Sequence, residues 1–154
     1  MEEGARIAVL DRDPAALEAA GKVLPPEQAI LIAADVTSEE DVAGAIEKAQ
    51  GFLGAIDIVF SNAGNFGEVK PIAEYSLETF RSVLDVHVTG AFLTAKHVVP
   101  AMRDSGSLII TSSVAGTRGD PGVYGYITAK HAQVGLMRCP GLSSGQNGTG
   151  CLVN

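Results

Sequence analysis

Short apolar runs alternate with longer amphipathic stretches along most of the chain. Four such runs, rich in Ile, Val, Leu and Ala, have the length of strands buried within a sheet. They cover residues 6–10, 29–33, 56–61 and 107–111. A helical stretch is expected after each run, and this alternation of strands and helices predicts an α/β fold.

The first two helices carry recognisable start signals. Pro14 opens the first of them, behind Asp13 as N-cap. Ser38, followed three residues later by Asp41, makes a variant of the capping box for a helix that runs to about Gln50. Both signals place a helix start just after a predicted strand.

A longer helix is predicted over 76–102, because its apolar residues recur every three or four positions. These residues are Leu77, Phe80, Leu84, Val88, Ala91, Ala95 and Val98. Pro100 is expected to end or kink this helix. The last helix is predicted from about Val123 to about Arg138.

The composition describes a globular chain. Of its 154 residues 46% are hydrophobic and 18 are glycine, which fits a glycine-rich α/β domain rather than a disordered chain. The net charge of −7 argues against nucleic acid or an anionic membrane as partner, and no apolar run reaches the ~18 residues of a membrane span. Two cysteines, Cys139 and Cys151, are too few for a disulfide framework, so we expect reduced thiols and a cytoplasmic location.

Candidate chemistry follows the last apolar run. Ser113 lies just beyond it, and Tyr126 and Lys130 come on the next predicted helix. Residues four apart share a helix face, so the Lys130 ammonium would lie within reach of the Tyr126 phenol. A phenol is a poor acid at neutral pH, but a nearby cation stabilises its phenolate, which would make Tyr126 a usable proton donor or acceptor. A serine hydroxyl beside it could polarise a carbonyl, so the set predicts proton transfer at a carbonyl or alcohol.

Two segments together resemble the active site of the short-chain dehydrogenase/reductase family: Ser112-Ser113-Val114-Ala115-Gly116, and then Tyr126-Ile127-Thr128-Ala129-Lys130. The resemblance extends over about residues 5–138. It implies part of a doubly wound parallel sheet of the Rossmann type, and an NAD(P)-dependent oxidoreductase that moves a hydride between NAD(H) and an alcohol or ketone. It also implies that Tyr126 is the general acid/base, that Ser113 orients the carbonyl, and that Lys130 assists Tyr126 and holds the nicotinamide ribose.

The resemblance implies cofactor contacts at the ends of the predicted strands. Asp11 would bind the adenine ribose, since an acid at the tip of a parallel strand can bond both hydroxyls. An Asp here goes with NAD rather than NADP, although Arg12 beside it could tolerate a 2′-phosphate. Asp35 and Val36 match an adenine contact, and a solvated turn carboxylate is an equally good interpretation of Asp35.

The segment Asn62-Ala63-Gly64 also stands as the family has it. Small residues here would let the backbone approach a ligand closely, and the Asn62 amide could tie neighbouring strand ends together. The alternative interpretation is an ordinary turn from strand to loop.

His87 stands where the family usually has an Asn that holds a water in a proton relay to the lysine. An imidazole can donate and accept and titrates near neutrality, so a relay role and a packed core histidine both remain open.

In the family the helix over 76–102 pairs with its copy in another subunit, which implies a homo-oligomer.

The chain departs from the resembled fold at both ends. That fold opens with a strand and a Gly-rich turn that seats the pyrophosphate, and no such glycine fingerprint precedes Ala5. The absent strand belongs in the middle of the sheet, so the strands over 6–10 and 56–61 would have to close up or leave backbone groups unpaired. After Arg138 no charged residue occurs, and we expect 139–154 to be a disordered tail, outside the resemblance, on a domain over 1–138.

Three hypotheses follow. The first is the oxidoreductase, truncated at both ends and lacking the first strand and the last strands. The second is a non-catalytic truncated form that only associates with full-length subunits. The third is a small α/β signalling domain with Asp11 and Asp35 as a metal pair, in which Ser113, Tyr126 and Lys130 have no use; we expect no metal site.

Overall fold

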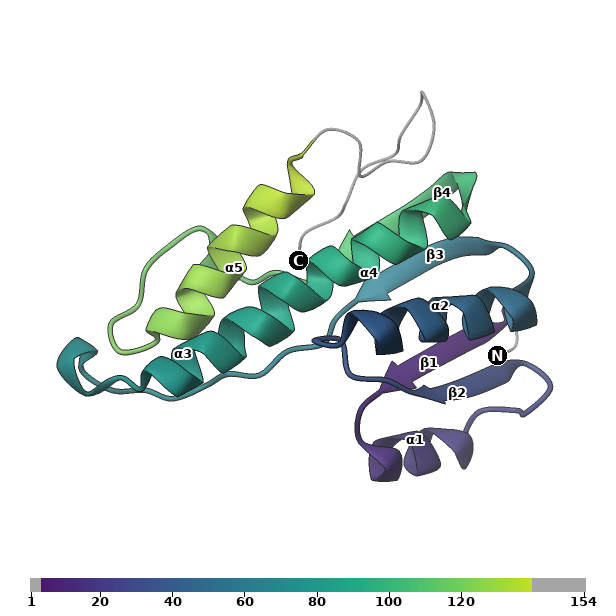
Figure 1. The fold of residues 1–154 in the computed structure, drawn as a ribbon, viewed down its shortest axis with the longest axis horizontal. Helices are drawn as coiled ribbons and strands as arrows, with labels where there is room; N and C mark the ends of the chain where they lie inside the picture. The colour runs from purple at the N-terminus through teal and green to yellow at the C-terminus, as the bar shows by residue number, and fades with distance from the viewer. Residues whose placement is uncertain (1–3, 140–154) are drawn as a thin grey trace.

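The computed structural model describes residues 4–139 as alternating strands and helices, so the predicted α/β class is confirmed (Figure 1). The strands are β1 (Ile7–Asp11), β2 (Ala29–Ala33), β3 (Ile56–Ser61) and β4 (Met102–Ile110). The helices are α1 (Pro14–Gly21), α2 (Glu39–Leu53), α3 (Leu77–Leu84), α4 (Gly90–Val98) and α5 (Tyr124–Met137). The predicted disordered tail lies, from residue 140 on, outside the described residues.

The strands lie close to their predicted positions. The second and third match their apolar runs, and the first is shifted by one residue, so that Asp11 ends β1. β4 begins at Met102, five residues before the predicted start. Its pairing with β3 is irregular between Ile56 and Ile58. The added residues at the start of β4 are mostly polar, so no apolar run in the sequence predicts them.

The helix starts were predicted correctly, but the capping box was only half right. Asp13 caps α1 by accepting from Ala15 N at 2.8 Å. Ser38 caps α2 by accepting from Asp41 N at 3.2 Å. The reciprocal bond is absent, because Asp41 Oδ2 instead accepts from Asp35 N at 3.0 Å. Asp41 therefore ties the end of β2 to α2.

The single helix predicted over 76–102 is wrong in detail. α3 and α4 follow one helical path (Figure 1), but a π-helical turn over Asp85–Thr89 separates them, in which Gly90 N donates to Asp85 O five residues earlier. α4 then ends in a 3₁₀ turn over Val99–Ala101 that contains Pro100. The three-to-four spacing of apolar residues does not reveal one extra residue in a turn, because that residue rotates the apolar face of the helix by less than the width of the apolar stripe.

The four strands form two separate sheets. β1 pairs only with β2 and β3 only with β4 among the described residues, both in parallel. α2 packs against β1 and β2, α4 packs against β3 and β4, and the two helices lie side by side (Figure 1). The larger core cluster joins these helices to β3 and β4 through Val42, Ile46, Ile56, Ala91, Leu93, Ala95, Val98, Leu108 and Ile110.

A cleft of about 650 Å³ remains between β1 and β3, with α2 and α4 along it. The strands have therefore not closed up, which is the second of the two outcomes expected from the sequence. Ile58 and Phe60 of β3 are 68% and 61% exposed and line this cleft. The separation keeps the carboxyl ends of β1 and β3 on either side of an open space.

Candidate active site

The structure brings six of the predicted cofactor-binding residues to one cleft. Asp11 ends β1, Asp35 and Val36 follow β2, and the segment 62–64 follows β3. All six line the cleft between β1 and β3. Ligands of open parallel α/β sheets bind outside the carboxyl ends of the strands, which is where these residues lie.

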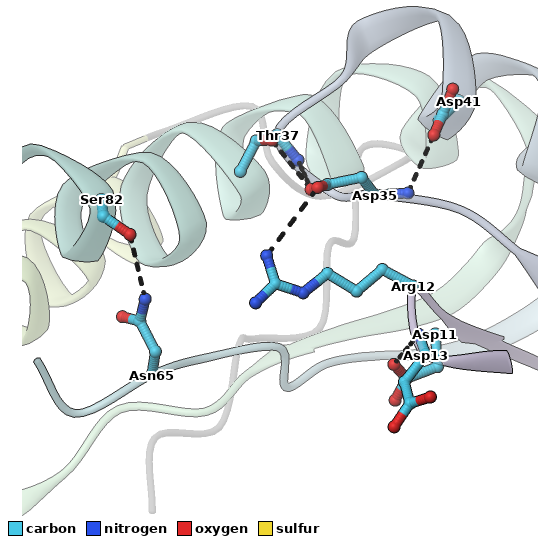
Figure 2. Close-up of polar contacts among 8 residues, drawn as sticks. All are labelled: Asp11, Arg12, Asp13, Asp35, Thr37, Asp41, Asn65 and Ser82. Carbon is cyan, nitrogen blue, oxygen red and sulfur yellow. Dashed lines mark hydrogen bonds and ion pairs between the residues drawn. The ribbon is translucent and has the colours of Figure 1, made fainter. Parts of the chain in front are cut away.

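Asp35 is held in the turn after β2 while it lines the cleft (Figure 2). Its Oδ1 accepts from Thr37 N at 2.9 Å and from Thr37 Oγ1 at 2.8 Å, and the Arg12 guanidinium lies 3.9 Å from Oδ2. The bonds from Thr37, followed by the charge of Arg12, lower the pKa of Asp35. Asp35 is therefore an ionised turn carboxylate, and the turn also places it at the cleft.

Asp11 and Arg12 lie on the rim of the cleft (Figure 2). Asp11 Oδ1 accepts from Asp13 N at 2.9 Å, so the carboxylate is fixed by the turn that leads into α1. Arg12 is exposed and lines both this cleft and a second hollow of about 560 Å³ along α3. The two neighbours therefore present an acid and a cation at one strand end.

Gly64 lies closely against the His87 ring. A Cβ at Gly64 would lie 2.4 Å from His87 Cε1, well inside contact distance. The ends of β3 and β4 are joined by the backbone, since Thr111 N donates to Ser61 O at 3.0 Å, and the tie through the Asn62 amide stays a prediction. The small residue after β3 therefore makes room for an imidazole from the π-helical turn.

His87 is 2% exposed and bonded to the loop after β3. Its Nε2 lies 2.7 Å from Asn65 O and 3.1 Å from Asn65 N, so the ring is joined to the Asn65 backbone. Burial, together with the nearby charge of Lys130, lowers the pKa of His87 against the opposing bond to Asn65. The ring is therefore neutral, and its buried Nδ1 has no partner among the described residues.

Lys130 is 4% exposed, and its ammonium is held by two oxygens. Nζ donates to Thr111 O at 2.8 Å and to Gln133 Oε1 at 3.0 Å. Burial lowers the pKa of Lys130. Nζ lies 5.4 Å from the centroid of the Tyr126 ring, so the predicted pair on one helix face is present.

Tyr126 is half-buried between two other rings. The Phe66 centroid lies 5.1 Å away, and the His87 ring meets Tyr126 edge-on at 5.5 Å. Ser113 Oγ accepts from Ala115 N at 3.2 Å and begins a 3₁₀ turn that packs against α5. The structure thus assembles Tyr126 and His87 directly with Lys130, and places Ser113 on the adjoining turn.

Three residues at this site were not found from the sequence. Gln133 contacts Lys130, Asn65 holds His87, and Phe66 packs at a tilt against Tyr126. The spacing of Gln133, three residues after Lys130, could have shown that the two share a helix face. Asn65 and Phe66 follow directly on the segment 62–64, but nothing in their order indicates which side chain they meet.

Residues 4–139 hold neither a cluster of metal ligands nor a helix that could cross a bilayer. No three His, Cys, Asp or Glu side chains gather there as metal ligands. No helix in that range combines the length and the apolar character needed to cross a bilayer.

Comparison with known proteins identifies sequences and structures to which this chain is similar. The family described as short chain dehydrogenase matches residues 1–151. Xanthoxin dehydrogenase from Arabidopsis thaliana is 36% identical over 96% of this chain, and 2,5-dichloro-2,5-cyclohexadiene-1,4-diol dehydrogenase from Sphingobium indicum is 38% identical over 94%. The crystal structure of NAD⁺-bound xylitol dehydrogenase superposes with a TM-score of 0.82 at 38% identity, over 88% of this chain.

The chain matches only part of each of these proteins. It covers 54% of the Arabidopsis protein, 59% of the Sphingobium protein and 54% of the xylitol dehydrogenase chain. The chain thus spans between half and three-fifths of the length of these relatives.

Proposed function

The chain belongs to the short-chain dehydrogenase family, whose members it matches along almost its whole length, and on that premise we propose that it serves hydride transfer between NAD(H) and an alcohol or ketone. One observation carries the proposal: residues from three strand ends line a single cleft, and Tyr126 and Lys130 stand together with His87, whose ring bonds to Asn65 of the cleft lining. The names of the relatives support it, since each is a dehydrogenase and one neighbour is NAD⁺-bound.

The residues at the cleft fit the adenosine part of a nicotinamide dinucleotide. Asp11 would bind the adenine ribose, Asp35 and Val36 the adenine, and the backbone over 62–64 the remaining part that lies against β3. The Asp11 and Asp35 carboxylates on the cleft lining are hydrogen-bond acceptors of the kind that ribose hydroxyls and an adenine amino group require. When bound, the cofactor supplies the hydride.

The catalytic side chains have separate tasks in this proposal. Tyr126 gives or takes the proton at the substrate oxygen, and Ser113 holds that oxygen. Lys130 keeps its ammonium beside the Tyr126 ring and binds the nicotinamide ribose. Since burial makes the charged form of Lys130 costly, its two oxygen partners are what hold the charge there.

The cofactor is proposed to be NAD rather than NADP. The Asp11 carboxylate on the cleft rim would repel a 2′-phosphate. The Arg12 guanidinium, which could offset that repulsion, lies 3.9 Å from the Asp35 carboxylate. Titration of the chain with NADH and NADPH, followed by cofactor fluorescence, should show the tighter binding for NADH, and equal affinities would refute the preference.

Turnover tests the role of Tyr126. Tyr126→Phe should abolish most reduction of a ketone panel by NADH while leaving NADH binding in place. Tyr124→Phe is a matched control. Tyr124 lies on α5 two residues before Tyr126, and its ring packs edge-on against Tyr75 instead. Near-normal turnover in Tyr126→Phe would exclude the proton-transfer role.

A non-catalytic, associating form is the second candidate. It is favoured by the open cleft between the two sheets and by the exposed Leu77 and Phe92 on the helical path 76–102, because exposed apolar side chains often mark interfaces. Light scattering on a sizing column should then show an oligomer that Phe92→Ser weakens. NADH binding at micromolar concentration would rule this candidate out, and a monomer at all concentrations would remove the proposed interface.

A further inference from the structure

Gln133 connects two helical segments behind Tyr126 through its side-chain amide. Its Nε2 donates to the backbone carbonyl of His87 at 3.0 Å, and its Oε1 accepts from Lys130 Nζ at 3.0 Å. Gln133 is 2% exposed, so solvent does not compete for either bond. The amide is therefore a fixed link between α5 and the π-helical turn.

The two partners of Gln133 leave only one orientation for its amide. A lysine ammonium only donates, and a backbone carbonyl only accepts. A side chain that bridges them must therefore offer one acceptor and one donor a short distance apart. An ionised glutamate would lose the bond to His87, and a leucine would lose both.

The bridge acts on an ammonium that has one further N–H to donate. Nζ carries three N–H groups; one meets Thr111 O at 2.8 Å and one meets Gln133 Oε1. The third is left for the side of Tyr126, whose ring centroid lies 5.4 Å from Nζ. The titratable groups that face this ammonium are His87 on the π-helical turn and Tyr126 on α5 itself.

We propose that Gln133 is a positioning residue, whose amide anchors Lys130 to the π-helical turn that carries His87 and thereby keeps the third N–H directed toward the Tyr126 site. The proposal rests on the proposed function only for the use of that third N–H. The anchoring itself is a property of this chain that can be measured without cofactor or substrate. Without the bridge, Nζ would keep the bond to Thr111 O, and the ammonium could turn about that single contact.

Side-chain NMR of the 154-residue chain tests the anchoring. Lys130 is one of five lysines, and its ε-methylene signals can be assigned by comparison with Lys130→Arg. A fixed ammonium should give two separate Hε shifts in the unaltered chain. Gln133→Leu should merge them into one, while the control Gln50→Leu, on the exposed face of α2, should leave them split.

Gln133→Glu separates positioning from a purely structural role. It keeps an acceptor for Lys130 but loses the donor to His87, so the Lys130 shifts should stay split. An opposite charge at this distance should also raise the midpoint of the Lys130 titration by roughly 1–3 pH units. If Gln133 only pinned α5 to the π-helical turn, both variants would lower the melting temperature, and the Lys130 Hε shifts would stay split in Gln133→Leu.

Several results would overturn the proposal. One is a single merged Hε signal in the unaltered chain, which needs no variant to fold. Another is unchanged splitting in a folded Gln133→Leu chain, or, should that variant not fold, an unshifted Lys130 titration in Gln133→Glu. Because no readout involves NADH, failure of NADH binding would count against the proposed function and leave the anchoring result standing.

Discussion

Gly64→Ala is the substitution whose effect the structure defines most sharply. The added Cβ would lie 2.4 Å from His87 Cε1 and 3.0 Å from Nε2. His87 cannot easily move aside, because it is buried and its Nε2 is bonded to the Asn65 backbone. The backbone itself adds no strain, since Gly64 is not among the glycines of residues 4–139 that have a positive φ, which are Gly4, Gly54, Gly67 and Gly122.

The expected cost follows from two opposing terms. Forcing an extra carbon into a packed site costs about 1–3 kcal/mol. Replacing glycine by alanine also restricts the unfolded chain, which returns about 0.4–1 kcal/mol. The free energy of unfolding should therefore fall by roughly 1–2 kcal/mol, a sizeable share of a total of about 5–15 kcal/mol.

Urea unfolding followed by far-UV circular dichroism measures this change, as the chain has no tryptophan to report by fluorescence. Gly44→Ala is the matched control: the residue lies inside α2, and a Cβ there would meet nothing within 4 Å. That control should gain about 0.5–1 kcal/mol, because alanine is the better helix former. The same substitution should thus lower the free energy of unfolding at Gly64 and raise it at Gly44.

A double-mutant cycle identifies the cause. In a His87→Ala background the added Cβ has no ring to meet, so Gly64→Ala should lose most of its cost. The coupling energy should therefore be about 1–2 kcal/mol, with the two single effects adding to more than the double effect. A cost that is equal in both backgrounds, or no cost at all, would refute the contact on which the reasoning rests.

Two further predictions concern stability. Ser38→Ala removes the N-cap of α2 and should lower the free energy of unfolding by about 1 kcal/mol; an unchanged urea midpoint would show that the bond to Asp41 N contributes nothing. Burial lowers the pKa of His87. Its contribution to the free energy of unfolding is therefore complete above the unfolded-state pKa of about 6.5, and it is lost as the pH falls below that value. The urea midpoint should drop between about pH 7.5 and about pH 5.5, less so in His87→Asn, and an equal drop in both proteins would exclude His87 as its source.

Local features were predictable because a few neighbouring residues decide them. Apolar runs of strand length gave β2 and β3 at their observed bounds, and Asp13 and Ser38 were recognised as caps from their positions before a helix. The pairing of Tyr126 with Lys130 followed from the helical repeat, since both lie on one segment.

The contacts between segments were not predictable in the same way. The close neighbour of Gly64 is a histidine that lies 23 residues further on, and the partner of Gln133 is the His87 carbonyl. No repeat or spacing links such residues, because the distance between them is set by how helices and strands pack. The π-helical turn belongs to the same group, as one extra residue in a turn leaves the apolar stripe almost unchanged.

The order of apolar and polar residues thus fixed which segments are strands or helices, where the helices begin, and which face of α5 carries the phenol and the amine. Packing alone decided that β1 and β3 stand apart around a cleft, that Asp41 bonds to the end of β2, and that Gln133 bridges Lys130 to the π-helical turn. The physical reason is one of range. Backbone preferences and side-chain periodicity act over a few residues, whereas a buried donor or acceptor takes whichever partner the packed elements bring within about 3 Å.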